Sequence, residues 1–195
     1  MSEMKRTWIE GVEYSYDANE EYEKDGHVYC KTCHERKDGK ILEFFGGKMI
    51  CRVSCHCDKQ REEKEAKRQK QLEIERLKSS CFSSRAEWEY SFENYQGEEN
   101  QSLLIAKNFV KDYEQMKKEN VGLLFYGTVG SGKTYLACSI ANALIEQYQV
   151  PVKIRNFSQI MNEMQKCGFD FDKNAYIESL VNTPVLILDD LGIER

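Results

Sequence analysis

The segment Gly127 to Thr134, with the sequence GTVGSGKT, constrains the fold of this chain more than any other feature. It fits the pattern G-x-x-x-x-G-K-[ST], in which glycines let backbone N–H groups turn inward around phosphate oxygens. Such a loop needs a strand before it and a helix after it. The apolar run Leu123 to Tyr126 predicts the strand, and the run from Lys133 to about Tyr148 predicts the helix. We therefore expect an α/β domain built around this loop.

The loop residues also indicate the ligand. Lys133 is placed to reach the β and γ oxygens of a nucleotide, and the Thr134 hydroxyl is a ligand for Mg²⁺. The other contacts are expected from the backbone of Gly127, Thr128, Val129, Gly130, Ser131 and Gly132. The pattern predicts that the chain binds ATP together with Mg²⁺, with Lys133 as a catalytic residue.

An acidic pair follows the last apolar strand of the sequence. Val152 to Asn156 and Val185 to Leu188 both read as strands, and the second runs directly into Asp189 and Asp190. Acids at the end of an apolar strand beside a phosphate loop are typical of a magnesium site. We expect Asp189 to hold Mg²⁺, through water, and Asp190 to orient or deprotonate the attacking water. The alternative for Asp190 is a turn or helix cap without a catalytic role, because Asp also favours the exit from a strand.

A cluster of cysteines indicates a metal site in the N-terminal part. Five of the eight cysteines lie within the segment 30–57, at Cys30, Cys33, Cys51, Cys55 and Cys57. Two separated groups of thiolates are how proteins hold tetrahedral zinc. The runs 41–45 and 48–53 read as strands joined by Gly46-Gly47, a hairpin that would carry the second group back to the first.

Five cysteines compete for four places at this site. The preferred zinc ligands are Cys30, Cys33, Cys55 and Cys57. Replacing one of the last pair by Cys51 is the alternative, and His34 and His56 are close enough in sequence to compete. The reading without a metal, small buried cysteines, is disfavoured because the segment 25–57 is too small and polar to fold on an apolar core of its own. Zinc with four protein ligands would be structural, since no position stays open for a substrate.

Composition changes sharply after this segment, which predicts three regions. Residues 1–57 form the zinc-binding module, residues 58–81 a charged helical linker, and residues 82–195 the nucleotide-binding part. From Asp58 to Lys78 there is no Gly or Pro and charges of both signs are mixed, so a solvated connecting helix is favoured. Apolar residues come only late, at Leu72, Ile74 and Leu77, so only the C-terminal end should pack on a core.

Charge and hydropathy exclude two classes of protein. The chain has 28 Lys and Arg against 33 Asp and Glu, a formal net charge of −5, so it lacks the basic excess of a protein held to DNA mainly through phosphates. Any DNA contact must be local or provided by partners. The longest uncharged apolar run, Pro184 to Leu188, cannot span a bilayer, and Met1 to Glu10 has no signal-peptide core. We expect a cytoplasmic protein without a membrane segment.

Motifs on both sides of the phosphate loop resemble a known family. They are Gly122 to Gly127, the loop itself, Thr134 to Ala137, Ile140 to Asn142 and Leu186 to Arg195. They resemble the DnaC-type helicase loaders, which are AAA+ ATPases of the ASCE class from bacteria and phages and are related to the IstB-like transposition helpers. The resemblance covers about residues 82–195, and the cysteine segment with its charged helix resembles the N-terminal zinc module of some members.

The resemblance implies a function and a fold. The full-length protein would use ATP to deliver a replicative ring helicase to single-stranded DNA, and would form homo-oligomers. Its sheet would be parallel, with Lys133 and Thr134 as the Walker A residues, Asp189 as the Walker B acid and Asp190 as the adjacent catalytic acid. Asp190 stands where many AAA+ proteins have Glu.

The resemblance also implies features beside and beyond these motifs. An aromatic segment ahead of the first strand, here Phe92 to Tyr95, would lie near the nucleotide, with Phe92 stacking on the base or simply packing. Independently of the resemblance, the residue types and their places beside the loop indicate that Phe125, Tyr126, Tyr135 and Cys138 are packing residues. The sensor residues and arginine finger of AAA+ proteins come later in sequence than Asp190. We therefore expect residues 1–195 to be an incomplete ATPase, inactive alone and in need of a partner.

Three other interpretations stay open. One is an IstB-like transposition helper ATPase, and another is a P-loop kinase acting on a metabolite, disfavoured by the adjacent acids Asp189 and Asp190. The third is a protein that is not an enzyme, in which a zinc module grips a helicase and the second part only binds nucleotide.

Overall fold

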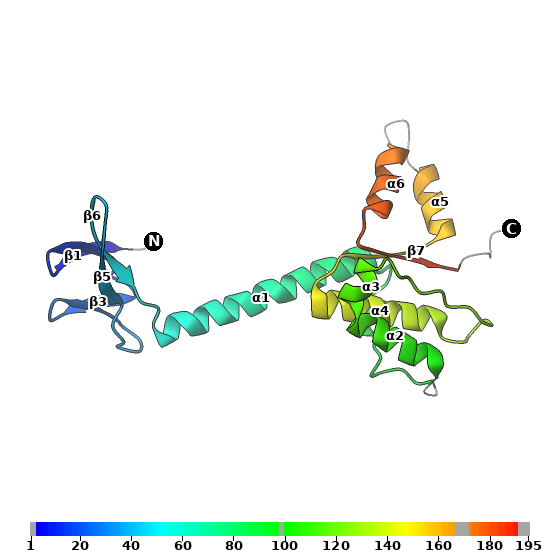
Figure 1. Ribbon diagram of the computed structural model, residues 1–195, viewed down its shortest axis with the longest axis horizontal. Coiled ribbons are helices and arrows are strands. Elements are labelled where there is room, and N and C mark those ends of the chain that lie inside the picture. The colour runs from blue at the N-terminus through cyan, green and yellow to red at the C-terminus, as the bar shows by residue number, and fades with distance from the viewer. Residues whose placement is uncertain (1–2, 98–99, 167–171, 191–195) are drawn as a thin grey trace. The chain divides into compact units, whose positions relative to one another are not determined.

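The computed structural model describes residues 3–97, 100–166 and 172–190. Contacts within the chain divide it into two compact units, Met1–Lys70 and Gln71–Arg195. Figure 1 shows the helices and strands, several of them labelled, and all are named below in chain order. Cys167 and the last five residues of the motif Leu186 to Arg195 lie outside the described residues. The boundary between the two units, after Lys70, lies within the expected linker 58–81, so the three regions expected from composition stay a prediction.

The described residues of unit 1 form three antiparallel hairpins. Their strands are β1 (Met4–Ile9) with β2 (Val12–Asp17), β3 (Glu21–Lys24) with β4 (His27–Cys30), and β5 (Asp38–Phe44) with β6 (Gly47–Arg52). Phe44 pairs with Gly47, so the loop of the third hairpin is Phe45-Gly46 and not Gly46-Gly47 as expected. Gly46 has a φ of 114°, which only glycine adopts readily, whereas Gly47 continues into the strand.

A small apolar core, not expected from the sequence, holds these hairpins together. Its buried members are Ile9, Val12, Tyr14, Tyr16, Val28 and Ile50. Four of the six come from the first 24 residues, where Val12, Tyr14 and Tyr16 alternate with exposed residues along β2. This period of two is the signature of a half-buried strand. Apolar packing therefore contributes to the order of this unit, with or without a metal.

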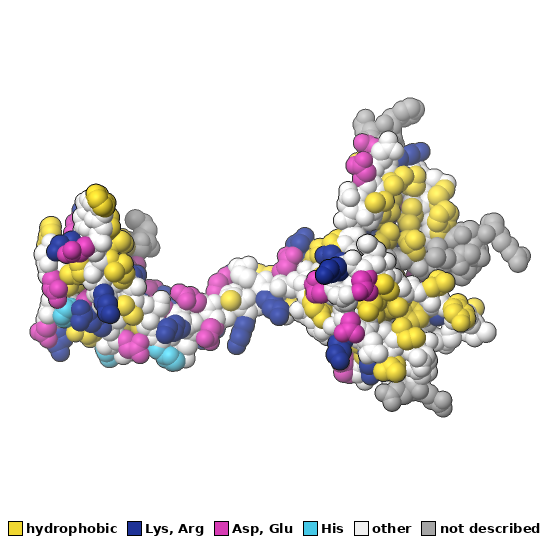
Figure 2. Space-filling view, viewed as in Figure 1, with side chains coloured by type: hydrophobic (Ala, Val, Ile, Leu, Met, Phe, Trp, Pro, Cys, Tyr) yellow, Lys and Arg dark blue, Asp and Glu magenta, His cyan; other side chains and the backbone are white. Residues whose placement is uncertain are grey.

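The expected linker helix is present as α1 (His56–Cys81). Figure 2 shows charged side chains of both signs along it, and its ion pairs include Glu65–Arg68 and Glu73–Arg76. Its C-terminal end belongs to unit 2, where Leu77 and Cys81 are buried. The charged stretch stays in solvent, as its composition predicts.

Unit 2 surrounds the long helix α4 (Lys133–Tyr148), which has the expected bounds. The other elements are η1 (Arg85–Glu89), α2 (Gln101–Lys111), α3 (Tyr113–Lys118), β7 (Val152–Asn156), α5 (Phe157–Lys166), α6 (Lys173–Val181) and β8 (Val185–Asp189). β7 and β8 are parallel, with Val152 beside Val185 and Asn156 beside Asp189. Val185 and Ile187 pack against the core, whereas Leu186 and Leu188 stay exposed. Figure 2 shows further hydrophobic side chains at the surface over α5 and α6.

The strand expected before the phosphate loop is not observed. Leu123 to Tyr126 belongs to none of the strand ladders of the described residues, so the parallel sheet is seen only as the β7–β8 pair. Leu123 and Phe125 pack against the core, but Leu124 is 79% and Tyr126 90% exposed. The expectation that Tyr126 is a packing residue is wrong. The segment alternates like a strand, yet a strand exists only where a neighbour completes its hydrogen bonds.

In the described parts of the chain, no helix combines the length and the apolar character that crossing a membrane requires.

Candidate functional site

The phosphate loop has the backbone conformation that its glycines predict. Gly127, Gly130 and Gly132 have φ values of 147°, 82° and 85°, which side chains with a Cβ rarely adopt. Gly132 is also the residue before α4, so the loop leads directly into the N-terminus of that helix. A helix N-terminus preceded by turning glycines is an arrangement that favours phosphate groups.

Lys133 and Thr134 occupy the first turn of α4. The Lys133 ammonium donates to the carbonyl oxygens of Gly127 (3.1 Å) and Thr128 (3.0 Å), so it folds back over the loop. The Thr134 hydroxyl donates to the Asp189 carboxylate at 2.9 Å. This contact joins two expected magnesium ligands that lie 55 residues apart in sequence. A hydroxyl and a carboxylate oxygen this close are the hard ligands that Mg²⁺ takes.

Asp190 follows β8 in an unusual backbone conformation. Its φ is 55°, in the left-handed region, and it is exposed. Asp tolerates this region better than most residues, which fits either the cap or the catalytic interpretation. Its catalytic role stays a prediction.

The aromatic segment ahead of the loop lies beside it, but Tyr95 and not Phe92 reaches the glycines. A Cβ on Gly132 would come within 3.3 Å of the Tyr95 hydroxyl oxygen. Phe92 packs against the core of unit 2. Tyr135 is a packing residue as expected: its ring stacks on Tyr90, with 4.6 Å between centroids. The family resemblance placed this segment near the nucleotide, and no signal in the sequence indicated which ring contacts the loop.

Four cysteine sulfurs of unit 1 gather in one place. They belong to Cys30, Cys33, Cys55 and Cys57, and all lie within 4.8 Å of one another. In a tetrahedral zinc site with bonds of about 2.3 Å, the sulfurs lie roughly 3.8 Å apart, so the group fits a zinc ion after a small contraction. This cluster could hold zinc. Cys51, His34 and His56 are not members of the group.

Local backbone structure places each pair of cysteines. The backbone N–H of His34 donates to the Cys30 carbonyl (3.0 Å), and that of Cys30 donates to the Glu35 carbonyl (2.9 Å), which makes a tight turn after β4. His34 adopts a φ of 59° to close it. Cys55 immediately precedes α1, and Cys57 lies in its first turn. Helix N-termini stabilise thiolates, so the start of α1 is suited to metal ligands.

The pKa values of Cys33, Cys55 and Cys57 are shifted from the ordinary thiol value, in different directions. The backbone N–H of Glu35 bonds the Cys33 sulfur and lowers the pKa of that thiol to about 7. The bond between Cys57 and Cys33 raises the pKa of Cys57 to about 12. Burial raises the pKa of Cys55. Four thiolates cannot coexist at this distance without a cation, which is the chemistry that zinc would supply.

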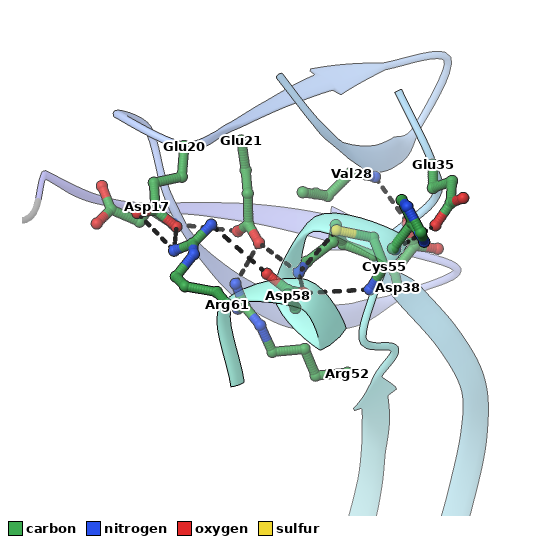
Figure 3. A network of polar contacts seen from close by, with 12 residues as sticks. Asp17, Glu20, Glu21, Val28, Glu35, Asp38, Arg52, Cys55, Asp58 and Arg61 are labelled. Atoms are coloured by element: carbon green, nitrogen blue, oxygen red, sulfur yellow. Dashed lines mark hydrogen bonds and ion pairs between the residues drawn. The ribbon is translucent and has the colours of Figure 1, made fainter. Parts of the chain in front are cut away.

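A network of polar contacts includes Cys55, one member of the cysteine cluster (Figure 3). The buried Asp38 carboxylate accepts from Val28 N–H (2.7 Å), Arg36 Nε (2.8 Å) and His27 Nδ1 (2.9 Å). Burial alone would raise the pKa of Asp38, but these donors together lower it. Arg61, on α1, donates to both oxygens of Glu20 (2.9 and 2.8 Å), which ties the helix to the hairpins.

Comparison with known proteins gives one family match. The model of the family described as Microtubule binding matches residues 40–189. The chain belongs to this family. The matched residues include the phosphate loop and Asp189, together with the later pair of cysteines, Cys55 and Cys57.

Two curated relatives from Bacillus subtilis (strain 168) have names that do not mention microtubules. The chain is 33% identical over 87 residues to the replicative helicase loader DnaI, covering 45% of this chain and 27% of the relative. It is 37% identical over 93 residues to the phage-like element PBSX protein XkdC, covering 44% of this chain and 32% of the relative. The chain thus spans about a third or less of the length of these relatives. No solved structure matches it.

Proposed function

We propose that the chain is the ATP-binding part of a helicase loader, with a zinc-binding module ahead of it. The observation that carries the proposal is the 2.9 Å contact between Thr134 and Asp189 beside the phosphate loop. The similarity to a relative named as a replicative helicase loader supports the choice of partner. The proposed protein acts in the cytoplasm and delivers a replicative helicase to single-stranded DNA.

Each residue of the loop has a proposed task. The backbone of residues 127–132 surrounds the phosphates, and Lys133 exchanges its bonds to Gly127 and Thr128 for phosphate oxygens. Thr134 and Asp189 hold Mg²⁺, which when bound offsets the charge of the β and γ phosphates. Asp190 orients a water or accepts its proton.

Calorimetric titration with ATP and Mg²⁺ tests the nucleotide site in the full chain. Lys133→Ala should weaken binding at least tenfold, and Thr134→Val should remove its dependence on Mg²⁺. Lys153→Ala is the matched control, because Lys153 bonds Ser179 on α6 and should leave the affinity unchanged. Equal affinity in Lys133→Ala and wild type would remove the proposal. Asp190→Asn should keep binding and lower turnover in any assay that shows hydrolysis.

Metal analysis tests the zinc module. Purified protein should carry one zinc per chain, and Cys55→Ser should reduce that content. Cys51→Ser should retain full zinc, because Cys51 is outside the group of four sulfurs. Absence of metal from wild type, together with a circular dichroism spectrum unaffected by a chelator, would show that the cysteines are not ligands.

The partner is tested with two binding assays at physiological salt. The chain should bind a purified bacterial replicative helicase, and Cys30→Ser should lose this binding while Lys133→Ala retains it, since we place the helicase contact on the zinc module. The second assay is sedimentation with microtubules, because the matching family is described as Microtubule binding. We place microtubules second because the motifs around the loop resemble helicase loaders. Sedimentation with microtubules and no binding to helicase would reverse the order.

Nucleotide binding without hydrolysis is the alternative function. It is favoured by one observation: Leu123 to Tyr126 is outside the β7–β8 ladder, so no described sheet bond holds the loop against Asp189. Turnover measured with and without helicase and single-stranded DNA separates the two functions. Stimulated hydrolysis supports the loader, and nucleotide binding with no turnover in any mixture supports the alternative.

A further inference from the structure

A buried lysine lies beside the cysteine cluster. Lys37, the residue before β5, is 3% exposed, although lysine is among the residues least often buried without a partner. Its ammonium is 3.9 Å from the Cys55 sulfur and is ion-paired with Asp58 on α1. Glu21 on β3 is also within reach, at 3.6 Å. Figure 3 shows Glu21, Cys55 and Asp58 converging on this region.

The backbone of Lys37 is fixed on three sides. Its N–H donates to the Val28 carbonyl (2.7 Å), and its carbonyl accepts from Val53 N–H (2.7 Å) and from the Tyr14 hydroxyl (3.1 Å). These bonds come from β2, from β4 and from the chain just after β6. The fold of the hairpins therefore fixes the backbone from which the Lys37 side chain extends.

The carboxylates around Lys37 have other cations. Glu21 is ion-paired with Arg52, and Asp58 lies 3.9 Å from Arg61. The Asp58 carboxylate also accepts the backbone N–H of Cys55 (3.1 Å), which brings negative charge next to a thiol. Lys37 is the cation that contacts both this carboxylate and a cluster sulfur. Without it, Asp58 and the Cys55 thiolate would repel each other.

We propose that Lys37 is a positioning residue of the metal site, which compensates the negative charge of four thiolates and so sets the metal affinity. The proposal rests on the proposed zinc site. Four thiolates and one Zn²⁺ carry a net charge of −2, and a partly buried charge of that size needs a compensating cation or donors. Lys37 supplies the cation and also ties the Cys55–Cys57 pair to the hairpins through Asp58. Groups of this kind orient the ligands and strengthen metal binding.

The test is the zinc affinity of full-length variants, measured by competition with a chelating dye at pH 7.5. Lys37→Met should lower the affinity 10- to 100-fold, the usual effect of removing a group that supports metal ligands. The double variant Lys37→Met/Glu21→Gln removes one buried positive and one buried negative charge together, so it should fold even where the single variant folds poorly. We expect it to show the same loss of zinc affinity. Arg52→Met is the control: it also contacts Glu21 but should change the affinity less than threefold. Co²⁺ added in place of Zn²⁺ should give the same tetrathiolate absorption bands in every variant, because the ligands are unchanged.

The outcomes separate two failures. A double variant that binds zinc within twofold of wild type would overturn the role of Lys37 and leave the zinc site standing. A loss in Arg52→Met equal to that of the double variant would also overturn it, because the effect would then belong to the network in general. A wild-type chain that takes up neither zinc nor Co²⁺ would remove the zinc site and this inference together.

Discussion

Replacing Asp38 by Asn should destabilise unit 1 without changing the size of the side chain. Oδ1 of Asp38 accepts from Val28 N–H, and Oδ2 accepts from Arg36 and His27. An Asn can keep the first bond through its oxygen. Its NH₂ group replaces Oδ2 and cannot accept from the other two donors. The variant therefore loses two bonds to a charged acceptor inside a fully buried position.

The magnitude follows from these two bonds. Hydrogen bonds to charged groups contribute about 1.5–3 kcal/mol each, which gives roughly 3–6 kcal/mol for two. The side chain of Arg36 is 45% exposed, so water replaces part of its interaction and we expect about 2–4 kcal/mol. Because the donors lower the pKa of Asp38, this stabilisation is complete above the ordinary carboxyl pKa of about 4 and is lost only as the pH falls below it. At pH 7 it is present in full.

Amide hydrogen exchange, followed by mass spectrometry in the intact chain, measures this loss of stability in unit 1. At about 1.4 kcal/mol per factor of ten, exchange in peptides of β3 and β4 should accelerate roughly 30- to 700-fold in zinc-loaded Asp38→Asn. Peptides of α4 in unit 2 should not change, which makes them an internal control. Asp17→Asn, whose remaining oxygen can still accept from Asn19 N–H, is the matched control and should have little effect. Acceleration of less than threefold in Asp38→Asn would refute the reasoning.

Two further predictions concern unit 2. The Asn142 amide donates to the carbonyls of Glu87 (2.8 Å) and Tyr90 (2.9 Å), so Asn142→Leu should lower the unfolding free energy of this unit by about 2 kcal/mol. Urea titration measures this change through the fluorescence of Trp88, with Trp8 replaced by Phe in both proteins because the chain has two tryptophans. An unchanged transition would mean that these bonds contribute nothing. Burial raises the pKa of Cys81 and Cys138 to about 12, so iodoacetamide at pH 8 should leave both unmodified until urea is added, as checked by peptide mass spectrometry. Modification of either thiol in the folded protein would contradict the burial that sets these pKa values.

Much of the local structure could be predicted from the sequence. The bounds of α4 follow from a glycine loop that leads into an apolar helix, and α1 follows from a charged run without Gly or Pro. β7 begins after Pro151, as expected. Cys138, on α4, is buried in the core as a packing residue, as its place on an apolar helix predicts. These features depend on residues close together in sequence, where backbone preferences and hydrophobic period decide the outcome.

Two further features of unit 1 also depend on residues close together in sequence, although the prediction did not include them correctly. The alternation of Val12, Tyr14 and Tyr16 was readable as a half-buried strand, and with it the core of unit 1. The predicted turn of the third hairpin, Gly46-Gly47, lies one residue later than the observed turn. Either of the two adjacent glycines suits a turn, and only the pairing of Phe44 with Gly47 decides between them.

Contacts between distant residues were decided by the tertiary structure. Sequence spacing left Cys51 as an alternative ligand, and only the folding of β4 against the start of α1 brings the other four sulfurs together. Lys37 reads as an ordinary surface lysine until the hairpins enclose it. Thr134 and Asp189 meet across 55 residues.

The segment before the phosphate loop shows the physical limit most directly. Leu123 to Tyr126 is apolar at all four positions, so the sequence by itself indicated a strand-like segment, whereas only the structure shows that Leu123 and Phe125 face the core. Whether it becomes a strand depends on a neighbour that can complete its backbone hydrogen bonds, and the described residues provide none. A helix such as α4 makes its backbone hydrogen bonds within its own segment, so it can be predicted from the local sequence. A strand forms only when neighbouring strands of the sheet complete its hydrogen bonds, so the local sequence does not determine it.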